Sequence, residues 1–495
     1  MFRPNVLVAT IALALALPAG AQTQTNPELD EIRKQIQELK ENYESRIQAL
    51  EKRLKEAEEN AAKAQSEANQ AQQSAAKAQR EADEAQQSAA QTQAQQSAQA
   101  GTAAPGGQQA APNAFNPSLS LILMGSYNNF SANPANVSVT GFLPAPLYGD
   151  VLGPRGFSLD ESEFSAAASV DPYFRGVFTA AFNDGEVSVE EAYFQTLALG
   201  HGLSLKGGRF FSSIGYENSI HSHAWDFKDP ALVQTVFLGS NFAETGLQLN
   251  WIAPTPLFIE LGTEIGAGTT DPGVGLDSGF NRNGIPSWTA YAHVGDDVGT
   301  GGSYRVGLST LQTSTGSNAI PFGDLDQTTG TTNLFTGNVR LYGLDFVYKW
   351  APDGNPVDRN FKFVAEWWYR EYAGNMLYDS TSTLGVGPVA EPFTAKQQGW
   401  YAQAVYQFLP KWRAGLRYDR LNEGSLSTGP TGIAIGATVP DYTPWRAAAM
   451  LDWSLSEFSR FRLEVQQDRA QQGVVNNEVF LQYIMSLGSH GAHKF

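Results

Sequence analysis

The chain has 495 residues and a formal net charge of -17, from 33 basic and 50 acidic residues. That sign argues against nucleic acid as a partner, because a nucleic-acid-binding face carries basic charge. The chain contains no cysteine, which excludes disulfides, thiol chemistry and cysteine-ligated metal.

Residues 1–21 are predicted to be a secretory signal. Arg3 stands in a short basic start, residues 6–17 are apolar, and small residues precede a cleavage site expected between Ala21 and Gln22. The apolar run of about twelve residues is too short to span a bilayer as a helix. Export is therefore expected, and the alternative is a retained membrane anchor.

Residues 22–98 are predicted to form a periplasmic coiled coil. Apolar residues from Leu29 to Tyr43 follow three-four spacing, and after a one-residue shift the register resumes at Ile47 and continues mainly on alanine. A lone or disordered helix is the alternative. Residues 99–117 combine Gly and Pro without periodicity, which is typical of a flexible linker.

Residues 118–495 contain repeated strands with one apolar and one polar face. In residues 412–419 the even positions are apolar and the odd ones polar or Gly, and residues 460–466 alternate in the same way. Strands of soluble sandwiches run about five or six residues. These run about ten, the length that a tilted strand needs to cross hydrocarbon. The predicted fold class is therefore an all-β transmembrane barrel in the bacterial outer membrane, preceded by the helical coil.

About sixteen antiparallel strands are expected, since bacterial barrels have an even number. Their predicted centres are Leu123, Ala166, Phe178, Ala192, Lys206, Leu247, Leu261, Ala292, Val306, Phe346, Ala365, Ala404, Leu416, Met450, Leu463 and Tyr483. Connections are alternately short and long, and the long ones are 131–159, 212–240, 268–286, 313–337, 374–396 and 422–440. Short turns face the periplasm in such barrels, which agrees with a periplasmic coil.

The alternation also predicts which charged residues face the lumen. Five arginines near the end of the chain point inward: Arg413, Arg417, Arg446, Arg460 and Arg462. The third long connection adds further candidates for a constriction, namely Glu217, Asp226, Lys228 and Asp229. Rings of charge at a constriction select ions in a water-filled pore. The alternative is that these charges pair with one another and support the structure.

His221 and His223 lie one residue apart in the same connection, in a chain with six histidines. Imidazole beside carboxylate is a plausible ligand set for Zn²⁺ or Cu²⁺. The alternative is that both histidines pack in the loop, and no other cofactor is expected. No grouping of nucleophile and base stands out, so we predict no enzyme.

Two sets of motifs carry a resemblance to known families. Residues 207–211 (GGRFF) followed by 214–218 (IGYEN) resemble the strand-to-loop signature of phosphate-selective and DcaP-like trimeric porins. Residues 221–227 (HSHAWDF), 251–255 (WIAPT) and 489–495 (SHGAHKF) resemble outer-membrane proteins labelled zinc-regulated TonB-dependent receptors. The porin resemblance implies a sixteen-stranded homotrimer whose third loop folds into the lumen.

The porin resemblance also implies site roles. His221, His223, Asp226 and Asp229 would line a constriction that faces the five arginines. Phe495 resembles the terminal signal read by the barrel-assembly machinery. Residues 101–495 depart from the basic lumen of phosphate-selective porins, with 22 basic and 36 acidic residues, net 22 - 36 = -14. The sequence also shows no plug domain of the kind a receptor requires.

The leading functional hypothesis is a porin-like channel for passive uptake of small polar or cationic solutes, trimerised by the N-terminal coil. The first alternative is an outer-membrane protein for uptake of zinc or another metal. The second is an envelope tether in which the barrel anchors a coil that contacts peptidoglycan. A trimeric adhesin is disfavoured, because its coil would be outside the cell.

Overall fold

The computed structural model describes residues 117–142, 152–183, 185–268, 283–315, 319–323, 331–385, 388–434 and 441–488, together with Lys55. The predicted signal with its cleavage site at Ala21, the coil over residues 22–98, almost all of the linker and the terminal Phe495 lie outside the described residues. The fold described below belongs to the compact unit Ala110–Phe495.

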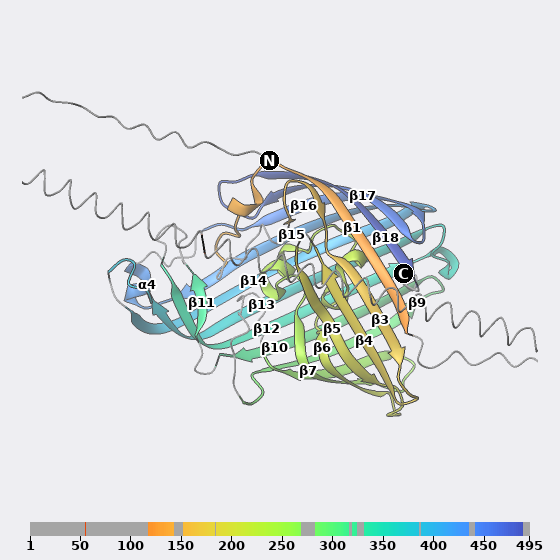
Figure 1. Ribbon diagram of the computed structural model, residues 1–495, viewed down its shortest axis with the longest axis horizontal. Helices are drawn as coiled ribbons and strands as arrows, with labels where there is room; N and C mark the ends of the chain where they lie inside the picture. Colours follow the sequence, from red (N-terminus) through yellow and green to blue (C-terminus); the bar gives the residue numbers. More distant parts are fainter. Residues whose placement is uncertain are drawn as a thin grey trace, which may run out of the picture. The chain divides into compact units, whose positions relative to one another are not determined.

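This unit is one antiparallel sheet closed into a barrel (Figure 1). Its first strand pairs with its last, so the sheet has no free edge. The strands are β1 Ser118–Phe130, β2 Gly156–Leu159, β3 Ser162–Ser169, β4 Phe174–Phe182, β5 Val187–Thr196, β6 Leu203–Phe211, β7 Ala243–Ile252, β8 Phe258–Gly266, β9 Ser287–Val298, β10 Gly302–Ser314, β11 Ile320–Gly323, β12 Asn333–Trp350, β13 Asn360–Tyr378, β14 Val389–Leu409, β15 Trp412–Ser427, β16 Trp445–Ser456, β17 Ser459–Arg469 and β18 Asn476–Gly488.

The 18 segments make sixteen barrel strands. β2 and β3 pair one after the other along β1, and β10 and β11 do the same along β12. Each of these two pairs is one barrel strand with an interruption, so the count is 18 - 2 = 16 within the described residues. Each predicted strand centre lies inside a different one of these sixteen strands.

The two faces of the strands also agree with the prediction. On β17, Phe461, Leu463 and Val465 are exposed on the outside, whereas Arg462 and Glu464 are buried inside. The outside of the barrel is therefore the apolar face that meets lipid, and the polar side chains point into the lumen.

Strand length differs between the two sides of the barrel, which the sequence pattern did not predict. β3 to β8 have 8 to 10 residues, whereas β12 to β15 have 16 to 21 (Figure 1). On the outer face of β12, apolar residues reach only from Trp350 to Tyr342 and are followed by Arg340 and Asn338. The long strands therefore extend beyond the lipid at their long-loop ends. We call β3 to β8 the short wall and β12 to β15 the tall wall.

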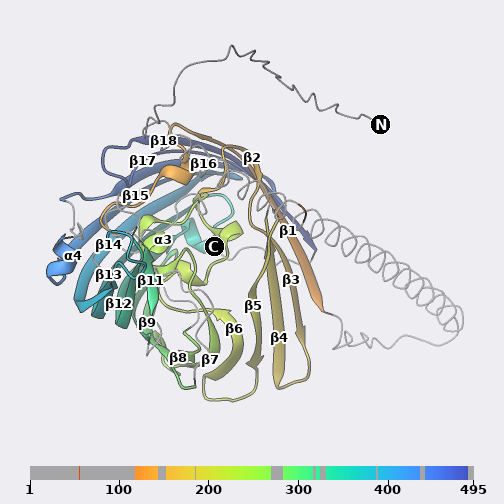
Figure 2. The ribbon, with the colours of Figure 1, turned by 60° about the vertical axis from the view of Figure 1, so that its left-hand side comes forward.

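Helical segments lie in the connections. They are η1 Pro134–Asn136, η2 Glu217–Ser219, η3 Ser222–Ala224, α3 Leu232–Leu238, η4 Pro352–Gly354 and α4 Pro430–Ala434. η2, η3 and α3 belong to one connection, residues 212–242 between β6 and β7, which we call the inward loop because it lies inside the ring of strands (Figure 2). No helix among the described residues is both long and apolar enough to span a membrane.

On the lipid face of a strand, the free-energy cost of introducing a charged residue should depend on how deep in the membrane that residue lies. Phe346→Arg places a charge at the centre of the apolar band of β12 and should lower the free energy of unfolding by about 2–4 kcal/mol in lipid vesicles. Asn338→Arg is the matched control, because it lies on the same face of the same strand beyond the band. Urea unfolding in vesicles measures both, and equal costs for the two variants would contradict this placement of the band.

Candidate functional site

The inward loop packs against the tall wall from inside the lumen. Every residue of α3 is buried, and its contacts are with β13, β14 and β15. Val233 and Phe237 of α3 belong to one apolar cluster with Trp368, Tyr401 and Leu421 of the wall. Apolar burial stabilises by roughly 25 cal/mol per Å² removed from water. This shared apolar cluster therefore holds the loop against the tall wall.

Local interactions fix the ends of the inward loop. Asn218 donates hydrogen bonds from Nδ2 to the carbonyl oxygens of Ser212 and Phe242, at 2.8 and 3.0 Å, and accepts one from the Phe242 amide. This side chain therefore holds the two ends of the loop together. Gly239 ends α3 with a φ of 61°, a left-handed conformation that glycine adopts without a steric penalty.

Each of the five predicted inward arginines contacts the inward loop. They bind as follows: Arg413 to the Asp226 carboxylate, Arg417 and Arg446 to the Asp229 carboxylate, Arg460 to the His223 carbonyl oxygen and Arg462 to the Trp225 carbonyl oxygen. We call these five residues the arginine wall. These contacts join the arginine wall to the inward loop.

Asp229 binds two of these arginines. Its Oδ1 lies 2.8 Å from Arg417 Nη2 and its Oδ2 lies 2.5 Å from Arg446 Nη1, and all three side chains are buried. Burial alone would raise the pKa of Asp229, but Arg446 and Arg417 outweigh it and lower that pKa to about 2. Asp229 is therefore a carboxylate at any physiological pH.

Two further loop carboxyls differ in charge state. Asp226 binds Lys362 Nζ at 2.5 Å and Arg413 Nη1 at 3.2 Å. Burial would raise the pKa of Asp226, but Lys362 and Arg413 outweigh that effect and lower it. Among the described residues, no cation forms an ion pair with Glu217, which instead accepts a hydrogen bond from Tyr401 Oη at 2.8 Å. Burial therefore raises the pKa of Glu217.

On the side of β10 to β17, cations rather than carboxylates meet solvent at the short-turn end of the lumen. The side chains of Arg305, Arg413, Lys362 and Arg460 are 26%, 22%, 18% and 15% exposed, and we call these four residues the cation row. Their partners Asp226, Asp345 and Asp452 are at most 3% exposed. A solute passing this part of the lumen therefore meets positive charge.

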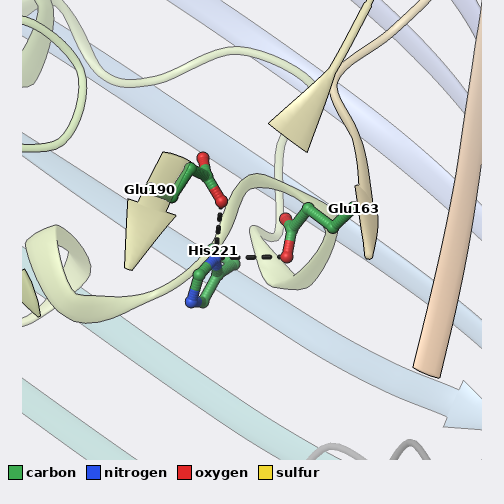
Figure 3. A group of neighbouring side chains, drawn as sticks. All are labelled: Glu163, Glu190 and His221. Atoms are coloured by element: carbon green, nitrogen blue, oxygen red, sulfur yellow. Dashed lines mark hydrogen bonds and ion pairs between the residues drawn. The ribbon is translucent and has the colours of Figure 1, made fainter. Parts of the chain in front are cut away.

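Opposite charge gathers where the inward loop meets the short wall. His221 Nδ1 lies 3.2 Å from Glu163 Oε2 and 3.1 Å from Glu190 Oε2 (Figure 3). The Nε2 atom of His221 lies 3.2 Å from Glu191 Oε2. His223 Nδ1 lies 2.7 Å from the other oxygen of Glu163. Burial would lower the pKa of His221, but its hydrogen bonds to the three glutamates outweigh burial and raise that pKa well above its ordinary value.

A β-bulge places two successive glutamates in this cluster. The register of β4 with β5 shifts, because Thr179 pairs with Glu191 and Ala180 with Val189, which leaves Glu190 as the extra residue. Side chains normally alternate between faces along a strand, but a bulge inserts one residue and re-aims its neighbours. Glu190 and Glu191 therefore both reach His221 from inside the barrel.

A cavity of about 710 Å³ lies next to this cluster. Its lining includes Asp160, Glu161, Ser222, Trp225 and Lys228. Lys228 Nζ lies 3.5 Å from Asp160 Oδ1 and donates to the Leu152 carbonyl oxygen at 3.1 Å. The predicted site residue Lys228 thus faces the cavity, away from the arginine wall.

The structure brings the predicted residues together as two groups on opposite sides of the loop. Asp226 and Asp229 meet the arginine wall, whereas His221 and His223 meet glutamates of β3 and β5. Sequence reasoning missed those glutamates. The available signal was the pair Glu190-Glu191 inside an otherwise alternating strand.

Residues 166–482 match the family described as "Putative beta-barrel porin-2, OmpL-like". A protein of Aquifex aeolicus (strain VF5), described as uncharacterized, is 34% identical over 364 residues, which cover 70% of this chain and 72% of that protein.

Solved structures also align with this chain. The channel DcaP of Acinetobacter baumannii is 14% identical with a TM-score of 0.42, over 75% of this chain and 97% of that one. Pseudomonas putida OprB is 14% identical with a TM-score of 0.44, over 75% and 94%. The family match supports the porin resemblance, and the receptor label is not confirmed.

The arginine wall predicts a large cost for removing one loop charge. Asp229→Asn removes the carboxylate that links Arg417 and Arg446 to the loop and leaves these buried arginines the carboxylates of Asp419 and Asp468 of the wall. Breaking these buried ion pairs should lower the free energy of unfolding by about 3 kcal/mol. Hydrogen–deuterium exchange should then be faster in α3. Asp353→Asn, in an exposed turn with a left-handed φ that Asn tolerates, is the control. Unchanged exchange in α3 would show that the arginine wall does not hold the loop.

The pKa of Asp229 determines the pH range in which its contact with the arginine wall stabilises the protein. Because the folded-state pKa is lowered from 3.8 to about 2, the stabilisation is present above pH 3.8 and is lost as pH falls through about 2. The difference in unfolding free energy between the wild type and Asp229→Asn should stay constant from neutral pH to pH 3.8 and shrink below it. Urea unfolding at each pH measures it, and a decline that begins near neutral pH would contradict the assignment.

Proposed function

Because the chain belongs to the OmpL-like beta-barrel porin-2 family, we propose that it forms an outer-membrane channel for passive uptake of small polar solutes, narrowed by the inward loop. The family is one of porins, which are channels rather than enzymes. The main observation behind the proposal is that the lumen surface carries positive charge on one side of the inward loop and negative charge on the other.

The charge separation favours polar solutes. The cation row lies on the side of β10 to β17, whereas Glu190, Glu191 and Glu260 are 11%, 12% and 18% exposed on β5 and β8. A polar molecule loses hydration on entering a narrow lumen, and fixed charges of both signs replace those interactions. The partly exposed glutamates favour the cationic solutes that the net charge predicts. The cation row adds affinity for an anionic group of the solute. Solutes that carry both signs therefore fit best.

We also propose that the barrel is a homotrimer. Ala166, Ala168 and Ala180 are small outward residues on the short wall, which suits close approach of a neighbouring subunit. The coil over residues 22–98 remains a prediction for trimerisation and for contact with peptidoglycan. Phe495 remains a prediction for recognition by the barrel-assembly machinery.

Single-channel recording in planar bilayers tests this function on the full mature chain. Stable current steps in groups of three support a trimeric channel. Single steps would overturn the trimer and leave the channel. A correctly folded barrel without conductance at any voltage would overturn the channel itself.

The cation row predicts a shift in ion selectivity. Arg305→Gln removes a partly exposed lumen charge and should raise the permeability ratio of K⁺ over Cl⁻ by about twofold to fivefold, since two charges 4 Å apart interact by about 1 kcal/mol in water. Reversal potentials across a KCl gradient measure the ratio. Arg420→Gln is the control, because Arg420 lies on the outer face of β15 and should leave the ratio unchanged.

A further inference from the structure

We propose that Glu163, Glu190 and His221 form a binding site for a divalent transition-metal ion on the lumen side of the short wall. The three side chains come from β3, β5 and the inward loop and converge on one point (Figure 3). Glu191 and His223 flank them. The site concerns binding alone, so it holds whether or not the barrel conducts.

The distances in the cluster suit a small metal ion. His221 Nδ1 lies 3.2 Å from Glu163 Oε2 and 3.1 Å from Glu190 Oε2, and the ligand atoms of the three residues all lie within 4.8 Å of one another. A tetrahedral ion with bonds of about 2.0–2.1 Å has ligand-to-ligand distances of roughly 3.3 Å. Little movement of the side chains is therefore needed to coordinate an ion.

The charge of the cluster favours a cation. Among the described residues, the ion pairs made by Glu163, Glu190 and Glu191 are all to His221 or His223. Three carboxylates thus depend on two imidazoles, and neighbouring Glu161 adds a fourth carboxyl. Carboxylates packed this closely repel one another in a site with little water. Exchange of the proton on His221 Nδ1 for a doubly charged ion adds one net positive charge among these carboxylates and relieves that repulsion further.

The ligand types point to transition metals rather than Mg²⁺ or Ca²⁺. Imidazole nitrogen with carboxylate oxygens suits Zn²⁺ and its neighbours in the first row, whereas Ca²⁺ and Mg²⁺ take oxygen ligands. One His and two Glu supply three protein ligands, and water completes the coordination. Binding replaces the proton on His221 Nδ1, which is released to solvent.

An ion in the lumen can reach this cluster. The side chain of His221 is 21% exposed and that of Glu190 is 11% exposed, whereas Glu163 is 1% exposed and forms the back of the site. The adjoining 710 Å³ cavity is lined by Glu161 and by Ser222, the residue next to His221. Because His221 belongs to the inward loop and both glutamates to the wall, a bound ion would link the loop to the short wall.

Zn²⁺ titration by calorimetry tests the proposal on the full mature chain. The tail histidines His490 and His493 lie outside the described residues, so the titration uses a His490→Ala/His493→Ala background in all proteins compared. One Zn²⁺ per chain should bind, with far weaker binding of Mg²⁺. Glu190→Gln keeps the size of the side chain and should weaken Zn²⁺ by at least about tenfold, since even outer-shell changes cost tenfold to a hundredfold.

Two more variants make the outcome decisive. His221→Ala should abolish the same binding event, and His201→Ala, in an exposed turn away from the cluster, should leave it intact. As a second readout, Zn²⁺ should raise the unfolding temperature of the background protein and of His201→Ala but not of Glu190→Gln. Zn²⁺ binding at full strength in folded Glu190→Gln and His221→Ala would overturn the site, as would no Zn²⁺ binding in the background protein.

Discussion

The structure depends on one constraint, which is that backbone amides and carbonyls have no water partners inside a lipid bilayer. Pairing of β1 with β18 satisfies this constraint, because closure leaves no strand with a free edge. Closure also separates each strand into a lipid side and a lumen side. The polar residues of the chain are thereby directed into one enclosed space, where they must find partners among themselves or in water.

That enclosed space is organised by charge. The arginine wall meets carboxylates and carbonyl oxygens of the inward loop on one side, and glutamates of β3 and β5 meet its histidines on the other. A buried charge without a partner is costly, so these contacts restrict the loop to one position more strictly than apolar packing alone would. The lumen that remains keeps positive charge near the short turns and negative charge near the short wall.

The barrel could be predicted from the sequence because lipid imposes a period of two on every strand. Trp412 to Tyr418 and Phe461 to Val465 show that period directly, and the sixteen predicted centres follow from it. The period assigns a residue to a face but says nothing about its partner across the lumen. The porin resemblance implied that Asp229 faces the arginines, but its individual contacts with Arg417 and Arg446 emerged only in three dimensions. The bulge at Glu190 was missed for a related reason, since a rule of strict alternation has no place for an extra residue.

Because the two walls differ in height, the entrance of the barrel is lower on one side than on the other. β14 has 21 residues and β4 has 9, a difference of 12 residues, which at about 3.3 Å per residue and a tilt of about 45° raises one rim by roughly 28 Å. In the proposed trimer, the low side of each barrel faces the neighbouring subunits, so the three tall walls enclose a lower central space. Uptake would then depend on what borders the low side, so the arrangement of neighbouring molecules in the membrane becomes part of the path that a solute follows.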